Sequence, residues 1–306
     1  MWKSLDRVGL DCLQSEPQGS QGVEAPAEDG EAAVNRVLWR NALETIGFLC
    51  VLTGSALPAQ NAASAPAAAT IATTQPAAPA KPTAEQIAAY MKAHDEQMKN
   101  DWPWLGRFKE ADVKLGAPAA GEKRVVFMGD SITEGWHFSE PGGVFADKPY
   151  VNRGISGQTS PQMVLRFRQD VIELQPKVVV ILAGTNDIAG NTGPMTLEQS
   201  EDNLATMADL ATANGIKVVL CSVLPAYDFP WKQGLTPAPK VLALNAWMKA
   251  YAAEKGYVYV DYHSAMKDER DGLPPALSND GVHPLPAGYV VMAPLVEAGI
   301  EKALAQ

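Results

Sequence analysis

Short apolar runs separated by amphipathic stretches make up most of the chain beyond residue 120. Apolar runs of four to eight residues, rich in β-branched side chains, are typical of strands buried on both faces of a parallel sheet. The first such run stops abruptly at Gly129-Asp130-Ser131. The pattern predicts five strands, over residues 125–128, 149–152, 178–182, 217–224 and 257–261.

Helical patterns occupy the intervals between these strands. Ser160-Pro161 reads as an N-cap followed by proline in the first turn, and Thr196 with Gln199 has the spacing of a capping box. The predicted helices cover residues 160–174, 196–213, 240–254 and 287–304. Strands that alternate with helices predict a three-layer α/β/α sandwich with a five-stranded parallel sheet, of flavodoxin-like type.

A further helix is predicted before this repeating part, starting at Thr83 in a segment rich in helix formers. His94 lies in it and is interpreted as a solvated residue. The stretch 101–108 is too aromatic for a plain linker, and we expect it to form an arm that packs on the domain through Trp102, Trp104 and Phe108. Helix and arm together span 83–120, so the globular domain is predicted to cover 83–306.

The first 82 residues have a different composition. Residues 1–45 are acidic without apolar periodicity, which predicts a disordered leader. Residues 46–59 combine an apolar run with small residues, as in a signal-peptide core, and the run is too short to span a bilayer. Residues 60–82 read as an Ala/Pro/Thr-rich linker. We therefore expect an exported protein, periplasmic or secreted after cleavage, and a cytoplasmic one if translation starts as written.

Charge and cysteine content narrow the class of protein. The formal net charge is −10, which argues against a protein that tracks nucleic-acid phosphates. The three cysteines form no disulfide framework, because Cys12 and Cys50 precede the domain and Cys221 lies in an apolar run. No stable membrane span is predicted.

Chemically reactive residues gather in loops that follow the predicted strands. In open α/β sheets, ligands bind at the carboxyl ends of the strands, where these loops meet. Ser131 follows the first strand, and its hydroxyl needs a base to act as a nucleophile at neutral pH. His283, before the last helix, can take that proton, and Asp280 can hold the imidazole by its other nitrogen. The predicted oxyanion donors are the backbone N–H groups of Ser131 and Gly154 and the side-chain amide of Asn186.

Four sequence blocks carry these residues: Gly129-Asp130-Ser131-Ile132, Gly154, Gly184-Thr185-Asn186-Asp187 and Asp280-Gly281-Val282-His283. In this order they resemble the SGNH hydrolases, also called GDSL esterases and lipases. The resemblance covers the chain from about residue 120 to its end. It implies a serine hydrolase that acts on esters without cofactor or metal, with a triad of Ser131, His283 and Asp280. The one departure noted is Ile132, which replaces the usual leucine.

Two other classes of protein remain open at this point. A metal-dependent phosphohydrolase could use Asp130, Asp187, Asp280 and His283 as ligands. A non-catalytic binding module could keep the fold, although the joint presence of the triad residues would then be unexplained. Within the resembled family, a lysophospholipase or a thioesterase is the alternative to a short-chain esterase.

The expected substrate is a small-molecule or carbohydrate ester with a short acyl group, acetyl above all. The aromatic and proline-rich loop 225–237 is expected to form one wall of the pocket, and no long apolar lid for a lipid chain is visible. The predicted substrate-binding residues are Trp136, Tyr227, Phe229 and Trp231.

Overall fold

The computed structural model describes residues 83–136, 145 and 147–306. The predicted leader, signal-peptide core and linker therefore lie outside the described residues. Within the described part, none of the helices is both long and apolar enough to cross a membrane.

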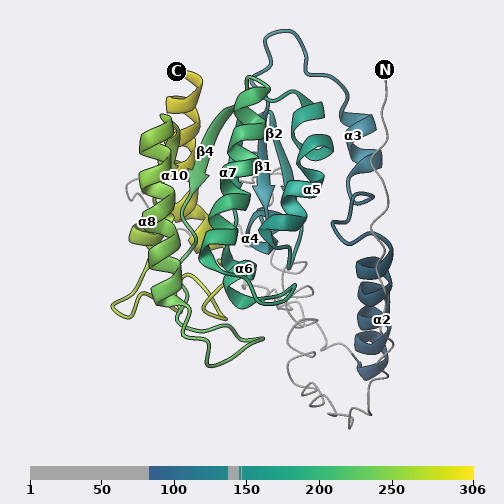
Figure 1. Ribbon diagram of the computed structural model, residues 1–306, viewed down its shortest axis with the longest axis vertical. Coiled ribbons are helices and arrows are strands. Elements are labelled where there is room, and N and C mark those ends of the chain that lie inside the picture. The colour runs from purple at the N-terminus through teal and green to yellow at the C-terminus, as the bar shows by residue number, and fades with distance from the viewer. Residues whose placement is uncertain (1–82, 137–144, 146) are drawn as a thin grey trace, which may run out of the picture.

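A five-stranded, fully parallel sheet forms the centre of the domain (Figure 1). Its spatial order is β2-β1-β3-β4-β5. After β2, which pairs with one side of β1, the chain crosses over so that β3 pairs with the other side of β1. The carboxyl ends of β1 and β3 therefore lie next to each other. The strands are β1 (Val125–Gly129), β2 (Tyr150–Gly154), β3 (Val178–Leu182), β4 (Lys217–Cys221) and β5 (Val258–Val260).

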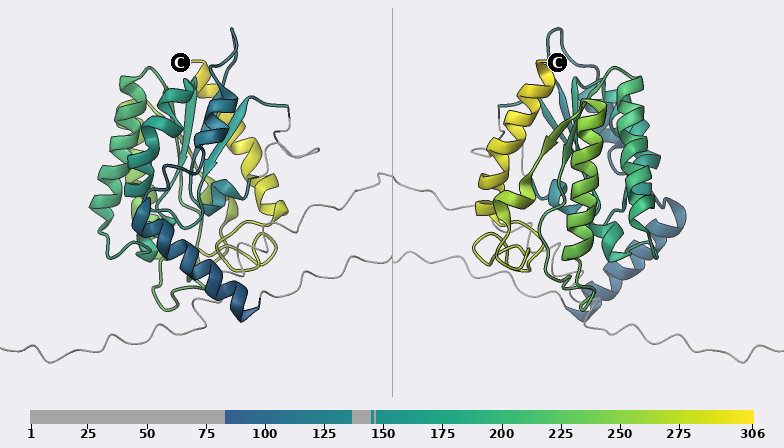
Figure 2. Two further views of the ribbon diagram at one scale, coloured as in Figure 1. Left: turned by 90° about the vertical axis from the view of Figure 1, so that its right-hand side faces the viewer. Right: turned by 60° about the vertical axis from the view of Figure 1, so that its left-hand side comes forward.

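Helices cover both faces of the sheet, so the three-layer α/β/α fold is confirmed (Figure 2). Side chains of α5, α7 and α8 pack against one face, and those of α10 pack against the other. The helices are α2 (Ala84–Asn100), α3 (Lys109–Leu115), α4 (Ser131–Glu134), α5 (Ser160–Asp170), α6 (Thr185–Ala189), α7 (Leu197–Ala213), α8 (Ala238–Lys255), α9 (Tyr262–Met266) and α10 (Pro286–Leu304), with the 3-10 turn η1 (Ile172–Leu174) after α5.

Several predicted boundaries shift by a few residues in the structure. The fourth strand, expected over 217–224, ends at Cys221, because its pairing with β5 stops at Val260, and β5 itself is shorter than the expected 257–261. The strand over 178–182 is confirmed in full, and the capping box of Thr196 and Gln199 opens α7. The N-cap of α5 is Thr159 rather than Ser160, because the Gln162 side chain accepts a hydrogen bond from the Thr159 N–H. The helix expected over 160–174 stops at Asp170 and continues only as η1.

The second strand extends two residues further than expected, which takes Gly154 into β2. Gly154 pairs with Gly129 of β1 and lies directly against α4. A Cβ atom at Gly154 would stand 2.1 Å from the Glu134 nitrogen, so only glycine allows this approach. The Asn152 amide reinforces the contact by donating to the carbonyls of Thr133 (2.7 Å) and Trp136 (2.9 Å).

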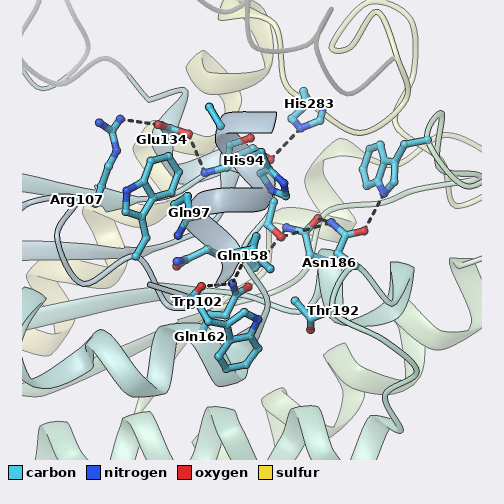
Figure 3. Close-up of a pocket in the computed structure, with 18 residues that line it drawn as sticks. His94, Gln97, Trp102, Arg107, Glu134, Gln158, Gln162, Asn186, Thr192 and His283 are labelled. Atoms are coloured by element: carbon cyan, nitrogen blue, oxygen red, sulfur yellow. Dashed lines mark hydrogen bonds and ion pairs between the residues drawn. The ribbon is translucent and has the colours of Figure 1, made fainter. Parts of the chain in front are cut away.

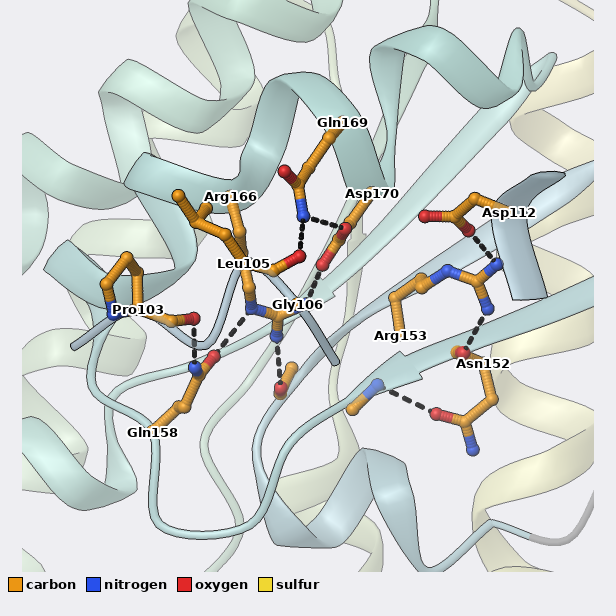
Figure 4. Close-up of polar contacts among 12 residues, drawn as sticks. Pro103, Leu105, Gly106, Asp112, Asn152, Arg153, Gln158, Arg166, Gln169 and Asp170 are labelled. Atoms are coloured by element: carbon orange, nitrogen blue, oxygen red, sulfur yellow. Dashed lines mark hydrogen bonds and ion pairs between the residues drawn. The ribbon is translucent and has the colours of Figure 1, made fainter. Parts of the chain in front are cut away.

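The N-terminal helix α2 lies at the same end of the domain as α4 and α6 (Figure 1). The arm that follows it is attached to the domain through its backbone (Figure 4). Three glutamine side chains donate to its carbonyl oxygens: Gln162 to Trp102 (2.8 Å), Gln158 to Pro103 (2.8 Å) and Gln169 to Leu105 (2.6 Å). Arg153 continues the attachment by pairing with Asp112 and lying 4.6 Å over the Phe108 ring.

We expect Gly154→Ala to lower the free energy of unfolding by about 1–3 kcal/mol, the usual effect of an added methyl group in packed surroundings. The methyl group meets backbone atoms of α4, which cannot move aside as a side chain could. Thermal or urea unfolding measures the effect. Gly106→Ala is the control, because its added Cβ would lie at an ordinary 3.5 Å from the Asp101 carboxylate. Equal stabilities for the two variants would contradict the close contact between β2 and α4.

Candidate active site

Ser131 stands at the first position of α4, immediately after β1. Asp130 is the N-cap of this helix, and its Oδ1 accepts a hydrogen bond from the Ile132 N–H at 3.0 Å. The sharp turn from strand to helix presents the Ser131 side chain at the carboxyl edge of the sheet. Backbone N–H groups of the first turn favour negative charge there.

The Ser131 hydroxyl, the His283 imidazole and the Asp280 carboxylate form one hydrogen-bonded line. The distance from Ser131 Oγ to His283 Nε2 is 2.9 Å, and that from His283 Nδ1 to Asp280 Oδ2 is 2.5 Å. An ionised carboxylate accepts hydrogen bonds only, so the imidazole donates from Nδ1 and its Nε2 can accept the serine proton. The three residues are therefore arranged as a nucleophile, a base and the group that orients the base.

The Asp280 carboxylate is kept ionised by its surroundings. Burial alone would raise its pKa, but hydrogen bonds from His283 and Ser278 outweigh the burial and hold the pKa below its usual value. Asp280 Oδ1 accepts from Ser278 Oγ (2.7 Å) and from the N–H groups of Val282 (2.9 Å) and His283 (2.8 Å). The loop thus fixes the position of the carboxylate before substrate arrives.

Asn186 lies beside Ser131, at the start of α6, and both residues line one pocket. Its Nδ2 donates to the Gln158 carbonyl (3.0 Å) and to Asp130 Oδ2 (3.3 Å), and its Oδ1 accepts from Asn191 at 2.7 Å. These contacts fix the orientation of the amide at the edge of the pocket. The structure thereby brings together the serine and the amide that the sequence predicts as oxyanion donors.

Gly154 does not take part as predicted. Its N–H donates to Asn152 Oδ1 at 2.8 Å inside β2, and Gly154 does not line the pocket. Gly157, three residues later, does line it and has a φ of 76°. The Gly157 N–H has no hydrogen-bond acceptor among the described residues. Gly157 is therefore the better candidate for the second backbone donor. The sequence predicted Gly154 because this glycine directly follows the expected strand, and no local signal marks the N–H of Gly157.

The pocket in front of Ser131 has a volume of about 250 Å³. Figure 3 shows His283 and Asn186 on one side of it and Arg107 and Glu134 on the other. Besides the catalytic candidates, its lining comprises Ala93, His94, Gln97, Met98, Trp102, Trp104, Arg107, Glu134, Ser156, Gly157, Gln158, Gln162, Asn191, Thr192 and Trp231.

Only one of the four predicted substrate-binding aromatic residues lines this pocket. Trp231 does so, with its ring centroid 5.9 Å from that of His283 and its Nε1 donating to Asn191 at 3.1 Å. Phe229 is fully buried and stacks behind Trp231 at 5.2 Å, so it supports the wall without facing the pocket. Tyr227 is half exposed outside the pocket, where Arg270 lies 4.6 Å over its ring.

The prediction for Trp136 is wrong because this side chain points into the core. It is 3% exposed and packs among the rings of Phe127 (5.7 Å), Phe145 (5.2 Å) and Tyr289 (5.3 Å). An indole two residues past a four-residue helix gives no sign in the sequence of which side it faces. The aromatic cluster fills the space between β1 and α10 instead.

Residues of the N-terminal helix and arm were missed as site residues. His94, expected to be solvated, and Gln97 of α2 line the pocket, as do Trp104 and Arg107 of the arm. The aromatic residues of 101–108 indicated that the arm packs on the domain. The sequence did not indicate where it packs, because the arm lies far along the chain from the predicted strand ends that carry the other site residues.

The four residues considered as metal ligands do not come together for that role. Asp130 caps α4, and Asp187 accepts from the Ser160 N–H at 2.7 Å at the start of α5. Among the described residues, no group of three or more histidine, cysteine or acidic side chains is arranged to hold a metal ion. The geometry gives the phosphohydrolase hypothesis no support.

The buried ion pair of Arg166 and Asp170 holds the loops of the site together (Figure 4). Arg166 donates to Asp170 (2.9 Å), to the Gly129 carbonyl (3.1 Å) and to Gln158 Oε1 (2.6 Å). Burial lowers the pKa of Arg166 to about 10, so the guanidinium stays charged at neutral pH. It therefore ties the end of β1, which carries Ser131, to the Gln158 segment that holds Asn186.

Fold and site together define an α/β protein with a hydrogen-bonded serine, histidine and aspartate at the carboxyl edge of its parallel sheet. The sequence profile of the GDSL-like lipase/acylhydrolase family matches residues 127–291, more than half of the chain. The chain belongs to this family of carboxylic ester hydrolases, as the four sequence blocks indicated.

The relatives agree with this assignment. An acetylxylan esterase of Xylanibacter ruminicola is 26% identical over 247 residues, which cover 69% of this chain and 48% of that protein. An acetylxylan esterase of Geobacillus stearothermophilus is 29% identical over 154 residues, covering 47% of this chain and 68% of that protein. The chain thus spans about half the length of the first. The crystal structure of a GDSL-like lipase from Bacteroides thetaiotaomicron is 47% identical with a TM-score of 0.64, covering 66% of this chain and all of that one (100%).

Replacing Asp130 by Asn should change how stability depends on pH. Burial raises the pKa of Asp130 to about 6 from 3.8, so its protonated form favours the folded state below pH 4 and that contribution is lost as the pH rises through 6. The amide that replaces the carboxyl group cannot ionise, so the variant does not lose this contribution as the pH rises. The free energy of unfolding of Asp130→Asn minus that of wild type should therefore increase by up to about 3 kcal/mol between pH 4 and pH 7. Urea unfolding at several pH values measures this difference. A difference independent of pH would mean that the Asp130 pKa is not raised.

Proposed function

We propose that the chain is a serine esterase that removes short acyl groups, acetyl foremost, from carbohydrate esters through an acyl-enzyme. The observation that carries the proposal is the hydrogen-bonded line from Ser131 through His283 to Asp280, which opens into a small pocket.

In the acylation step, Ser131 Oγ attacks the ester carbonyl carbon while His283 Nε2 takes the hydroxyl proton. The carbonyl oxygen becomes an oxyanion, to which we assign the N–H groups of Ser131 and Gly157 and the Asn186 amide as donors. The C–O bond to the alcohol then breaks, and the imidazolium returns its proton to the leaving oxygen. The Asp280 carboxylate stabilises the imidazolium while it exists.

In the deacylation step, water takes the place of the alcohol. His283 removes a proton from the water, whose oxygen attacks the acyl carbon. The bond to Ser131 Oγ breaks, the serine regains its proton, and the carboxylic acid leaves. The same donors hold the second oxyanion, so one arrangement serves both steps.

The pocket supports a small acyl group. Its volume of about 250 Å³ lies below the roughly 300–1,000 Å³ of pockets that hold drug-sized ligands. Polar side chains such as Gln97, Thr192 and Gln162 share its lining with indole rings. This mixture suits a hydroxylated ligand better than a hydrocarbon chain, and two relatives bear the name acetylxylan esterase.

A series of vinyl esters tests the acyl preference. We expect catalytic efficiency to be highest for vinyl acetate and to fall from butyrate to octanoate, because the pocket is small and polar side chains share its lining. Asn186→Ala should reduce kcat by about 10²–10³ on vinyl acetate, the usual effect of removing one oxyanion donor. Steady-state rates of acid release provide the readout.

Two outcomes would change the proposal. Highest efficiency with octanoate would favour the lysophospholipase or thioesterase alternative within the same family. Full activity in Asn186→Ala would show that its amide does not hold the oxyanion. Asn214→Ala is a matched amide control, because Asn214 lies exposed at the end of α7 and does not line the pocket.

A further inference from the structure

One side of the pocket is made by residues that precede the part matched by the family profile. The match begins at residue 127, whereas seven lining residues lie between 93 and 107. They come from the end of α2 and from the arm. The catalytic residues alone therefore do not define this side of the site.

Trp104 is held at the pocket by its own backbone. Its φ is 56°, a left-handed conformation that costs a non-glycine residue about 1–2 kcal/mol. Asp101 imposes this turn: its carbonyl accepts the Trp104 N–H (2.8 Å), and its carboxylate accepts the N–H groups of Leu105 (2.7 Å) and Gly106 (2.8 Å). The neighbouring carbonyls are held by the three glutamines, so the indole has a fixed position in the wall.

A charged pair stands next to this indole. The Arg107 guanidinium lies 5.4 Å from the Trp104 ring centroid and pairs with Glu134 at 3.1 Å. The other Glu134 oxygen accepts the Ser156 N–H at 2.8 Å, which links the pair to the loop that carries Gly157. Both charged groups face the pocket opposite His283 and Asn186 (Figure 3).

This wall suits a sugar ring and not an acyl chain. Placing a hydrocarbon chain against the ion pair would remove charged groups from water without replacing their hydrogen bonds. A pyranose ring instead offers C–H groups to an indole face and hydroxyls to a guanidinium and a carboxylate.

We propose that Trp104 and Arg107 form a subsite for the sugar portion of the ester and determine the specificity for the alcohol. This inference rests on the proposed esterase function and adds the residues that recognise the leaving sugar. It also gives a reason for the arm, since releasing the arm would remove one wall of the pocket.

The first experiment compares wild type, Trp104→Ala, Trp104→Phe and Arg107→Ala on two acetate esters with different alcohols, acetylated xylobiose and vinyl acetate. We expect Trp104→Ala to lower kcat/KM for acetylated xylobiose by about 10-fold, mainly through KM, which corresponds to about 1.4 kcal/mol. Its loss on vinyl acetate should be several-fold smaller, because this ester carries no sugar, and Trp104→Phe should retain part of the preference.

The matched control is Arg270→Ala. Arg270 also lies over an aromatic ring, that of Tyr227, and pairs with Asp268 at 3.6 Å, but it does not line the pocket. It should leave both activities unchanged. Thermal unfolding of each variant shows whether the arm variants remain folded. Equal losses on both esters, or no loss on either, would overturn the subsite.

A binding measurement separates this inference from the proposed function. Xylobiose is titrated into Ser131→Ala and into Ser131→Ala/Trp104→Ala, with tryptophan fluorescence or calorimetry as the readout. Binding lost with Trp104 supports the subsite even if wild type leaves vinyl acetate intact, a result that would refute the esterase. If wild type cleaves vinyl acetate but Ser131→Ala does not bind xylobiose, the sugar subsite is wrong and the esterase stands.

Discussion

The hydrogen bond between Ser131 and His283 joins two segments that are 152 residues apart, and its 2.9 Å length constrains the rest of the fold. Ser131 takes its position from the end of β1, whose neighbours on both sides are other strands. His283 takes its position from a loop folded around the Asp280 carboxylate just before α10. Because α10 packs across β3, β4 and β5, the sheet fixes both ends of this contact. The nucleophile and its base can meet only if the whole α/β/α sandwich is formed.

Hydrogen bonds among buried polar groups fix the positions of the other residues of the site. Arg166, which forms a fully buried pair with Asp170, donates to the Gly129 carbonyl and to the Gln158 side chain. Gln158 in turn holds Asn186 through its carbonyl and Pro103 through its amide. One network thus reaches the nucleophile, an oxyanion donor and the arm. Removing one partner of such a buried pair typically costs about 3–5 kcal/mol, so the site and the stability of the fold depend on the same groups.

The sequence was sufficient for the fold and for the grouping of polar residues at the strand ends, because apolar runs and caps are local signals. It located Ser131, Asn186, Asp280 and His283 correctly in space, since carboxyl ends of parallel strands share an edge. It failed where the outcome depended on which way a side chain or a backbone N–H pointed. Trp136 went to the core, and Gly154 was chosen where Gly157 faces the pocket. The role of Trp104 depends on contacts from distant glutamines, which no local pattern reveals.

The most direct test of the account is covalent labelling of the full chain with a small fluorophosphonate, followed by peptide mass spectrometry. The account expects one phosphonate per chain, on Ser131, with loss of ester hydrolysis in step with labelling. Labelling should be absent in Ser131→Ala and much slower in His283→Ala, because the serine then lacks its base. Ester hydrolysis that persists after full labelling of Ser131, or that disappears with a chelator while Ser131 stays unlabelled, would contradict it.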